Sequence, residues 1–231
     1  MRILALDCSA GPASVAVCRD GQIIASSFVN VKLTHSQTLM PMIKSTLESA
    51  MLTLSDIEGF AVNYGPGSFT GIRIGISAVK GLAAPKNLPC IPVSTLLSIP
   101  YCHLDTDCIL CAAMDARCSQ VYNALFRIKE GTVTRLCEDR AVMVADVAKE
   151  LEEYNEKILV AGDGAQLFAP YCEENKNITI ASEPLRYQNA CGVALAAEEL
   201  AQNRVTAREL APYYLRLPQA ERELKLKKEN K

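Results

Sequence analysis

The expected order of secondary structure elements occurs twice along the chain, once on each side of about residue 105. Each half is expected to begin with three strands in an antiparallel meander and to continue with a helix, a strand and a helix. In the first half we expect strands at 3–8, 14–18, 22–29 and 57–64, with helices at 34–50 and 72–84. An antiparallel meander that precedes αβα units favours a mixed sheet with helices on its faces. The repeat therefore predicts an α/β protein with two similar lobes and a cleft between them.

Local signals support these assignments and set the expected boundaries. Asp20-Gly21 is a two-residue hairpin signal, and Pro41 is expected to kink its helix or restrict where it starts. In the second half we expect strands at 108–115, 120–128, 132–137, 158–161 and 178–181, and helices at 144–154, after Gly164 and at 189–203. The predicted division is 1–104 for the first lobe, 105–218 for the second and 219–231 for a charged tail. The last helix is a candidate to pack back on the first lobe.

Charge and hydropathy exclude two classes of protein. The formal net charge is −2, whereas proteins that bind nucleic acid alone carry a basic surplus that neutralises phosphates. Lys225, Lys227, Lys228 and Lys231 in the tail are interleaved with glutamates, which favours a solvated segment over an RNA contact. No apolar run approaches the roughly 20 residues of a membrane span, and no signal peptide is recognisable at the start. The expected location is the cytoplasm.

The sequence offers few residues for a metal site or a catalytic centre. Only His35 and His103 are present, and the ten cysteines are scattered through apolar segments. We therefore expect no metal ligand set and reduced, structural cysteines. Asp7 and Asp115 each end the first strand of a lobe, where two carboxylates can flank a cleft and hold Mg²⁺ in a phosphoryl-transfer enzyme. Neither is followed by paired glycines, so no catalytic residue is predicted.

A glycine-rich loop runs from Gly65 to Gly71 and leads into a helix. Such a loop can present backbone N–H groups to an anion, although the Gly-Lys-Ser/Thr of a Walker A motif does not follow. The alternative is that the glycines permit special backbone angles and that Ser68 or Thr70 caps the helix. The candidate nucleotide- or anion-binding residues are Asp7, Ser9, Gly65, Gly67, Ser68 and Thr70.

Two helices of the first half are apolar around most of their circumference. A helix of this kind must be covered on most sides, either by its own protein or by another one. The pattern permits two alternatives: both helices lie deep in the core, or together they form an exposed face that docks a partner. The candidate partner-binding residues are His35, Leu39, Met42, Ile43, Thr46, Gly71, Ile72, Arg73, Gly75, Ile76 and Val79.

Six stretches distributed along the chain form a recognisable pattern. They are Ile3-Leu4-Ala5-Leu6-Asp7-Cys8-Ser9, His35-Ser36-Gln37, the block from Gly65 to Gly75, Met114-Asp115-Ala116-Arg117, Ala161-Gly162-Asp163-Gly164 and Tyr214-Leu215-Arg216. Together they resemble the family of tRNA threonylcarbamoyladenosine biosynthesis proteins TsaB, also called YeaZ. The resemblance spans nearly the whole chain, and the block from Gly65 to Gly75 is its most specific part.

The resemblance implies a duplicated RNase H-like fold, the fold of actin, Hsp70 and the sugar kinases. It also implies a non-catalytic subunit that binds and activates a TsaD-type threonylcarbamoyltransferase, beside a TsaE-like ATPase. Within the family the two first-lobe helices form the interface with TsaD, or a homodimer when the chain is alone. The tRNA would be contacted indirectly, and ATP or ADP would sit at the interface rather than as an intrinsic cofactor.

One departure from TsaD bears on catalysis. TsaD-like subunits hold a metal through an H-x-x-x-H motif, and this chain has His35 and Leu39 where two histidines are needed. This departure favours the hypothesis of a non-catalytic subunit. The alternative is an ATP-dependent enzyme of the actin-like superfamily, related to proteins that have been labelled M22 glycoproteases, acting on its own.

Overall fold

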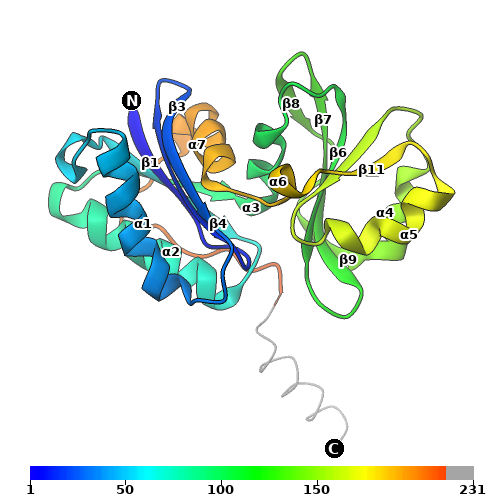
Figure 1. Ribbon diagram of the computed structural model, residues 1–231, viewed down its shortest axis with the longest axis horizontal. Helices are drawn as coiled ribbons and strands as arrows, with labels where there is room; N and C mark the ends of the chain where they lie inside the picture. Colours follow the sequence, from blue (N-terminus) through cyan, green and yellow to red (C-terminus); the bar gives the residue numbers. More distant parts are fainter. Residues whose placement is uncertain (217–231) are drawn as a thin grey trace, which may run out of the picture.

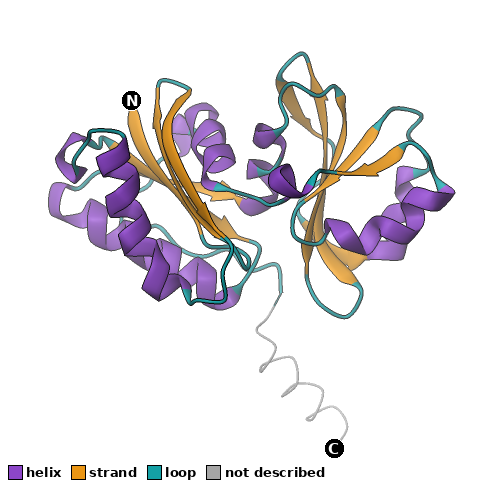
Figure 2. Cartoon of the chain, in the orientation of Figure 1, coloured by secondary structure: helices purple, strands orange, loops and turns teal. Residues whose placement is uncertain are grey.

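The computed structural model describes residues 1–216 and contains two mixed β-sheets side by side (Figures 1 and 2). The N-terminal sheet has the strand order β3-β2-β1-β4-β5. Its strands are β1 (Arg2–Asp7), β2 (Ala13–Arg19), β3 (Gln22–Val29), β4 (Gly59–Gly65) and β5 (Cys90–Ser94). The first three strands are antiparallel, whereas β4 and β5 run parallel to β1. The expected meander is confirmed, and Asp20 and Gly21 turn the hairpin between β2 and β3 with positive φ angles.

The second sheet repeats this order as β11-β10-β6-β7-β8, with β9 pairing on β7. Its strands are β6 (Cys108–Asp115), β7 (Gln120–Lys129), β8 (Thr132–Arg135), β9 (Arg140–Met143), β10 (Ile158–Ala161) and β11 (Ile178–Ile180). Strands β6, β7 and β8 form the antiparallel part, and β10 and β11 run parallel to β6. Each sheet is therefore a copy of the same five-stranded arrangement, which is the duplicated RNase H-like fold.

Helices cover the outer face of each sheet. Helices α1 (His35–Ser49) and α2 (Phe69–Ala83) pack on one face of the N-terminal sheet, around residues such as Leu6, Val15 and Phe60. Helices α4 (Val144–Leu151) and α5 (Ala169–Glu174) lie on the far face of the second sheet. The central strands are continuously apolar, and their successive side chains point to opposite faces of the sheet, as Leu4 and Leu6 do on one face and Ile3 and Ala5 on the other. Apolar residues recur at helical spacing on the covering helices, so each sheet and its helices enclose a core.

The space between the sheets is filled by α3 (Thr95–Ser98), which packs on the second sheet, and α7 (Ala190–Glu199), which packs on the first. Helix α7 follows the second sheet in sequence, yet Val193 and Ala197 pack against Ile3 and Ala16 of the N-terminal sheet. The short helix α6 (Glu183–Arg186) precedes it. The end of the chain thus completes a layer of the first lobe.

Some boundaries differ from the sequence expectation. Two short strands, β5 and β9, were not anticipated: Pro92 lies within β5, and β9 directly precedes a helix. Helix α1 begins at His35, so Pro41 lies inside the helix and does not determine its start. Thr34 lies at the N-cap, as expected. Within residues 1–216 no helix is long and apolar enough to cross a membrane. The predicted charged tail lies outside the described residues.

Candidate functional site

A cleft of about 400 Å³ opens between the two sheets, at the carboxyl ends of β1, β4 and β6. Loops that leave these strand ends meet at the same edge of each sheet, as is usual for ligand sites in α/β folds. The lining residues are Ser9, Ala10, Gly11, Pro66, Gly67, Ser68, Phe69, Met114, Asp115, Ala116, Arg117, Tyr122, Asp163, Tyr213, Tyr214, Leu215 and Arg216. Three of the six candidate nucleotide-binding residues, Ser9, Gly67 and Ser68, are among them.

The glycine-rich loop is packed tightly against the loop that follows β1. The Ser68 N–H donates to the Ser9 carbonyl over 2.7 Å. A side chain at Gly67 would place its Cβ 2.4 Å from that same carbonyl oxygen, and one at Gly71 would lie 2.0 Å from the Cys8 oxygen. The Ser68 Oγ accepts from the Gly71 N–H and so caps α2. These glycines are therefore required by close contacts inside the chain, which accounts for the motif without a bound phosphate.

The other three candidate residues lie outside the lining of the cleft. Asp7 is only 2% exposed, its Oδ1 accepts the Ser9 N–H over 2.8 Å, and burial raises its pKa. The backbone of Tyr213 covers Gly65, and Thr70 is exposed on α2. The structure therefore brings Asp115, but not Asp7, to the surface of the cleft.

Two carboxyl groups of the second lobe reach the cleft. The Asp115 Oδ1 accepts the Arg117 N–H over 2.7 Å, and its Oδ2 lies 3.6 Å from the Arg117 guanidinium. Burial, together with the nearby charge of Asp115, raises the pKa of Asp163 from 3.8 to about 6, although Gln188 partly offsets this by donating to it. Residues 117–119 all have positive φ angles, an uncommon conformation in non-glycine residues that concentrates at functional sites.

The last described residues, 204–216, form a segment that we name the strap. Val205 pairs with Cys90 at the open edge of β5, and the Tyr213 N–H donates to the Tyr64 carbonyl over 2.8 Å. The Tyr214 ring stacks on Phe69 at 4.2 Å. Arg216 then reaches the second lobe, where it donates to the carbonyl of Ala116 and to Gln120. The strap thus covers a sheet edge, joins the lobes and forms one wall of the cleft.

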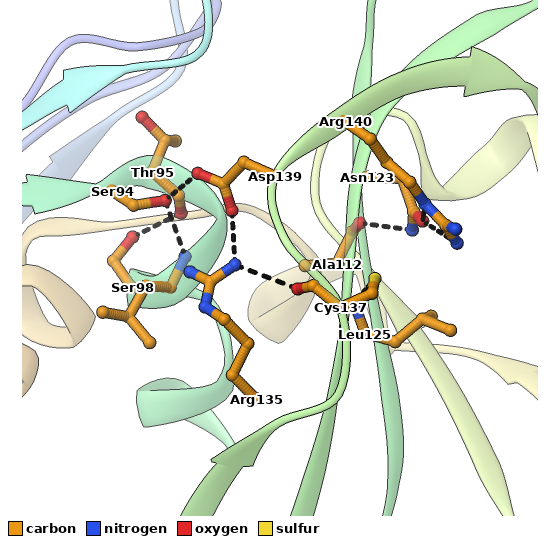
Figure 3. Close-up of polar contacts among 11 residues, drawn as sticks. Ser94, Thr95, Ser98, Ala112, Asn123, Leu125, Arg135, Cys137, Asp139 and Arg140 are labelled. Carbon is orange, nitrogen blue, oxygen red and sulfur yellow. Dashed lines mark hydrogen bonds and ion pairs between the residues drawn. The ribbon is translucent and has the colours of Figure 1, made fainter. Parts of the chain in front are cut away.

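A polar cluster that we name the inner cluster, formed by Ser94, Arg135 and Asp139, also joins the lobes (Figure 3). The Ser94 hydroxyl, at the start of α3, donates to Asp139 over 2.5 Å, and Arg135 donates to the other oxygen of that carboxylate over 2.7 Å. The Asp139 side chain is only 9% exposed. Farther into the second sheet, Arg140 on β9 donates to the buried Asn123 amide. Because charged hydrogen bonds in partly buried positions have well-defined geometry, this cluster fixes how the lobes face each other.

The structure corrects the predicted docking face on α1 and α2. Nine of the eleven candidate side chains and glycines are buried inside the chain's own core: Leu39, Met42, Ile43, Thr46, Gly71, Ile72, Gly75, Ile76 and Val79. They pack against the N-terminal sheet, and Thr46 bonds to Ser27 and to the Met42 carbonyl. Eight of these residues therefore support the two helices from inside the chain, whereas Ile43, although buried, also lines a groove on the outer surface of α1.

The two remaining candidates are partly accessible but bonded within the chain. The His35 Nε2 lies 2.8 Å from the Ala10 carbonyl, which joins the start of α1 to the loop after β1. The exposed Arg73 guanidinium lies 4.1 Å from the centre of the Phe69 ring and donates to the Tyr214 hydroxyl. Within residues 1–216 no three His, Cys, Asp or Glu side chains gather in a way that would hold a metal ion.

A different surface of the same helices is apolar and open. Met40, Lys44 and Glu48 recur every four residues along α1 and border a groove of about 310 Å³. The groove is also lined by Ile43 and Leu47 of α1, Leu82 of α2, and Leu52, Thr53 and Leu54. Met40 is 50% exposed and Met51, at the end of α1, is 92% exposed. We name this groove with Met51 the outer face.

The sequence interpretation missed several residues of the cleft. Arg117, Asp163, Tyr214 and Arg216 all lie in stretches that carried the family resemblance, but no role was assigned to them. The strap was missed because it has little regular secondary structure and acts through contacts distant in sequence.

Comparison with known proteins places the chain among proteins of tRNA modification. The family model of tRNA N6-adenosine threonylcarbamoyltransferase, TsaD, matches residues 26–223. TsaB of Bacillus subtilis is 30% identical over 221 residues, which is 96% of each chain. TsaB of Escherichia coli is 32% identical over 220 residues, covering 94% of this chain and 95% of that one.

Solved structures agree with the sequence relatives. YeaZ from Pseudomonas aeruginosa matches with a TM-score of 0.75 and 27% identity, over 92% of this chain and 100% of that one. A dehydratase component from Acidaminococcus fermentans matches with a TM-score of 0.53 and 14% identity, over 87% of this chain and 99% of that one, and so shares the fold alone. On this sequence and structural evidence, the chain belongs to the TsaB (YeaZ) family of tRNA threonylcarbamoyladenosine biosynthesis proteins.

Proposed function

We propose that this chain is a cytoplasmic, non-catalytic subunit that binds and activates a TsaD-type threonylcarbamoyltransferase through the outer face of α1 and α2. The observation that carries the proposal is the exposed apolar groove between these helices, which includes the half-exposed Met40. Methionine-rich surfaces adapt to a partner, and exposed apolar patches mark interaction sites. The charged pair Lys44 and Glu48 at the rim of the groove would set the orientation.

A TsaD-type protein is a fitting occupant because it is homologous to this chain. TsaD of Fusobacterium nucleatum is 31% identical over 119 residues, 45% of this chain. Two related folds can offer the same pair of helices to each other, so that four helices pack around one pseudo-twofold axis. The same geometry permits a homodimer when the partner is absent. A TsaE-like ATPase completes the proposed complex, and this chain contacts tRNA indirectly, as part of that complex.

The proposal is tested by placing a charge on the outer face. Met40→Glu should weaken binding to a TsaD-type partner by at least about tenfold, because a charge buried without a counter-ion in an apolar interface is costly. Titration calorimetry and light scattering after size exclusion measure the affinity and the stoichiometry. Met40 is exposed in the free chain, so its replacement should leave the melting temperature unchanged.

Met143→Glu is the matched control, because Met143 is 39% exposed on the other lobe. Equal binding of the partner by both variants would contradict the proposed docking surface.

Calorimetry with Mg-ATP tests the alternative function. Tight binding and turnover of ATP by the isolated chain would favour an ATP-dependent enzyme. Nucleotide binding seen only with the partner present would place ATP or ADP at the joint interface.

A further inference from the structure

The lining of the cleft combines arginines with aromatic rings, of which three are half-buried and Tyr213 is exposed. Phe69, Tyr122, Tyr213 and Tyr214 all line the cleft, and Tyr213 remains 38% exposed although its ring stacks on Tyr64. Proteins that bind single-stranded RNA use aromatic side chains of this kind as platforms for unstacked bases. The rings here are held rigidly, because the strap backbone is bonded to β4 and Arg73 fixes the Tyr214 hydroxyl.

The arginines differ in how free they are to bind a ligand. Both terminal nitrogens of Arg216 donate to the second lobe, and its guanidinium lies 5.9 Å from the centre of the Tyr122 ring. Arg117 has a side chain that is 84% exposed, and its 3.6 Å contact with Asp115 is loose. The strained backbone at 117–119 holds this arginine at the rim. Among residues 1–216 the cleft lining thus offers one accessible cation, Arg117, which suits one phosphate group.

The glycine-rich loop has part of its N–H groups already bonded within the chain, which makes it a poorer phosphate site than an open loop. Its Ser68 N–H is taken by Ser9, and its glycines contact the carbonyl oxygens of Ser9 and Cys8. A nucleoside triphosphate needs several N–H donors and a metal ion. A single nucleotide unit within an RNA chain needs only a stacking surface and one phosphate contact.

The carboxyl groups of the cleft add a preference among bases. Asp115 and Asp163 line the same cavity as the rings. Carboxyl oxygens accept hydrogen bonds from exocyclic amino groups, which adenine and cytosine carry and uracil lacks.

We propose that, in addition to the indirect contact with tRNA through the complex, the cleft itself binds one amino-bearing nucleotide of a single-stranded RNA, with its base against the aromatic wall of the strap and its phosphate on Arg117. The choice of RNA over other polyanions rests on the proposed role in tRNA modification. The binding surface is distinct from the outer face of α1 and α2, so RNA and the partner protein can be bound together.

The test measures binding of fluorescently labelled oligo(A) and oligo(U) to the full chain, alone and in complex with a TsaD-type partner. Tighter binding of oligo(A) is expected. Tyr213→Leu keeps an apolar side chain against Tyr64 but removes the aromatic face, and should weaken binding roughly five- to a hundredfold. Arg117→Ala should weaken binding to both oligonucleotides and reduce the slope of log affinity against log salt by about one.

Two variants outside the cleft serve as controls. Arg127→Ala removes another surface arginine of the second lobe, and Tyr171→Leu removes a half-buried tyrosine of α5. Both should bind oligo(A) as the wild type does. The proposal is wrong if oligo(A) does not bind, if the cleft variants bind like the controls, or if free ADP binds as tightly as oligo(A) and displaces it. Partner affinity, measured on the same variants, reports on the proposed function separately.

Discussion

At the scale of single residues, the environment of each carboxyl group determines what it can do. Asp7 and Asp115 occupy equivalent positions at the ends of β1 and β6, yet only Asp115 reaches the cleft. Asp163 is the more informative group, because it lines the cleft but is largely withdrawn from water. Its raised pKa follows from that burial and from the neighbouring Asp115 charge.

The Asp163 carboxyl should make stability depend on pH. Its folded-state pKa of about 6 lies above the ordinary value of 3.8, so the folded state binds more protons than the unfolded state between these values. Stability contributed by this group is therefore present at low pH and is lost as the pH rises through about 6. Asp163→Asn should have little effect near pH 4 and raise the unfolding free energy by up to about 3 kcal/mol near pH 7.5.

Urea unfolding of the wild type and the variant at both pH values measures this difference. Asp7 also has a raised pKa. Because Asp7 is present in both the wild type and the variant, its contribution cancels in the difference between their unfolding free energies. A variant that is equally stabilised at both pH values would show that the Asp163 carboxyl is not responsible.

At the scale of elements, the glycines of helix α2 differ in whether their lack of a side chain is needed. Gly71 lies where the helix meets the loop after β1, and Gly75 approaches Val62 of β4. Gly81 lies in the same helix with no atom within 4 Å of the position of a Cβ. The first two let the helix approach the sheet closely, whereas Gly81 only reduces helix propensity.

The contrast gives a paired prediction for α2. Gly81→Ala should stabilise the protein by about 0.5–1 kcal/mol, since alanine is the better helix former. Gly71→Ala should destabilise it by more than about 2 kcal/mol, because its Cβ would lie 2.0 Å from the Cys8 carbonyl oxygen. Thermal and urea unfolding measure both, and similar effects of the two changes would contradict the assigned close contact.

The two apolar helices also show what the sequence could and could not predict. Spacing located α1 and α2 correctly, because residues such as Leu39, Met42 and Ile43 recur at helical intervals. It did not say which apolar residues face outward, because Met40 and Met42 are chemically identical and differ only in direction. Their exposures of 50% and 7% depend on where the sheet lies.

At the scale of the whole molecule, contacts between residues distant in sequence fix the arrangement of the lobes. The inner cluster of Ser94, Arg135 and Asp139 lies outside the lining of the cleft, whereas Arg216 of the strap is part of that lining, and both join the two lobes. Repetition of the element order predicted two lobes and a cleft. The contacts that position the lobes were not predicted, because Ser94 and Asp139 lie 45 residues apart and show no periodicity.

The inner cluster should contribute substantially to stability. Asp139→Asn leaves the Arg135 charge without its carboxylate in a largely buried position and should cost about 3 kcal/mol. Glu156→Gln removes the partner of Arg127 in an exposed pair and should cost less than about 1 kcal/mol. Urea unfolding compares the two variants, and hydrogen exchange should show faster exchange in α3 only for the first. Equal costs would mean that the cluster does not hold the lobes.

The position of α7 has a consequence for how this protein is made. The ribosome releases β1 to β5 well before α7, the helix that shields one side of those strands. Until α7 emerges, Ile3, Ala16 and Ile91 lack most of their cover on that side. The N-terminal half therefore reaches its final form only after the second lobe has been synthesised, and cleavage of the chain between the lobes would separate the sheet from the helix that covers it.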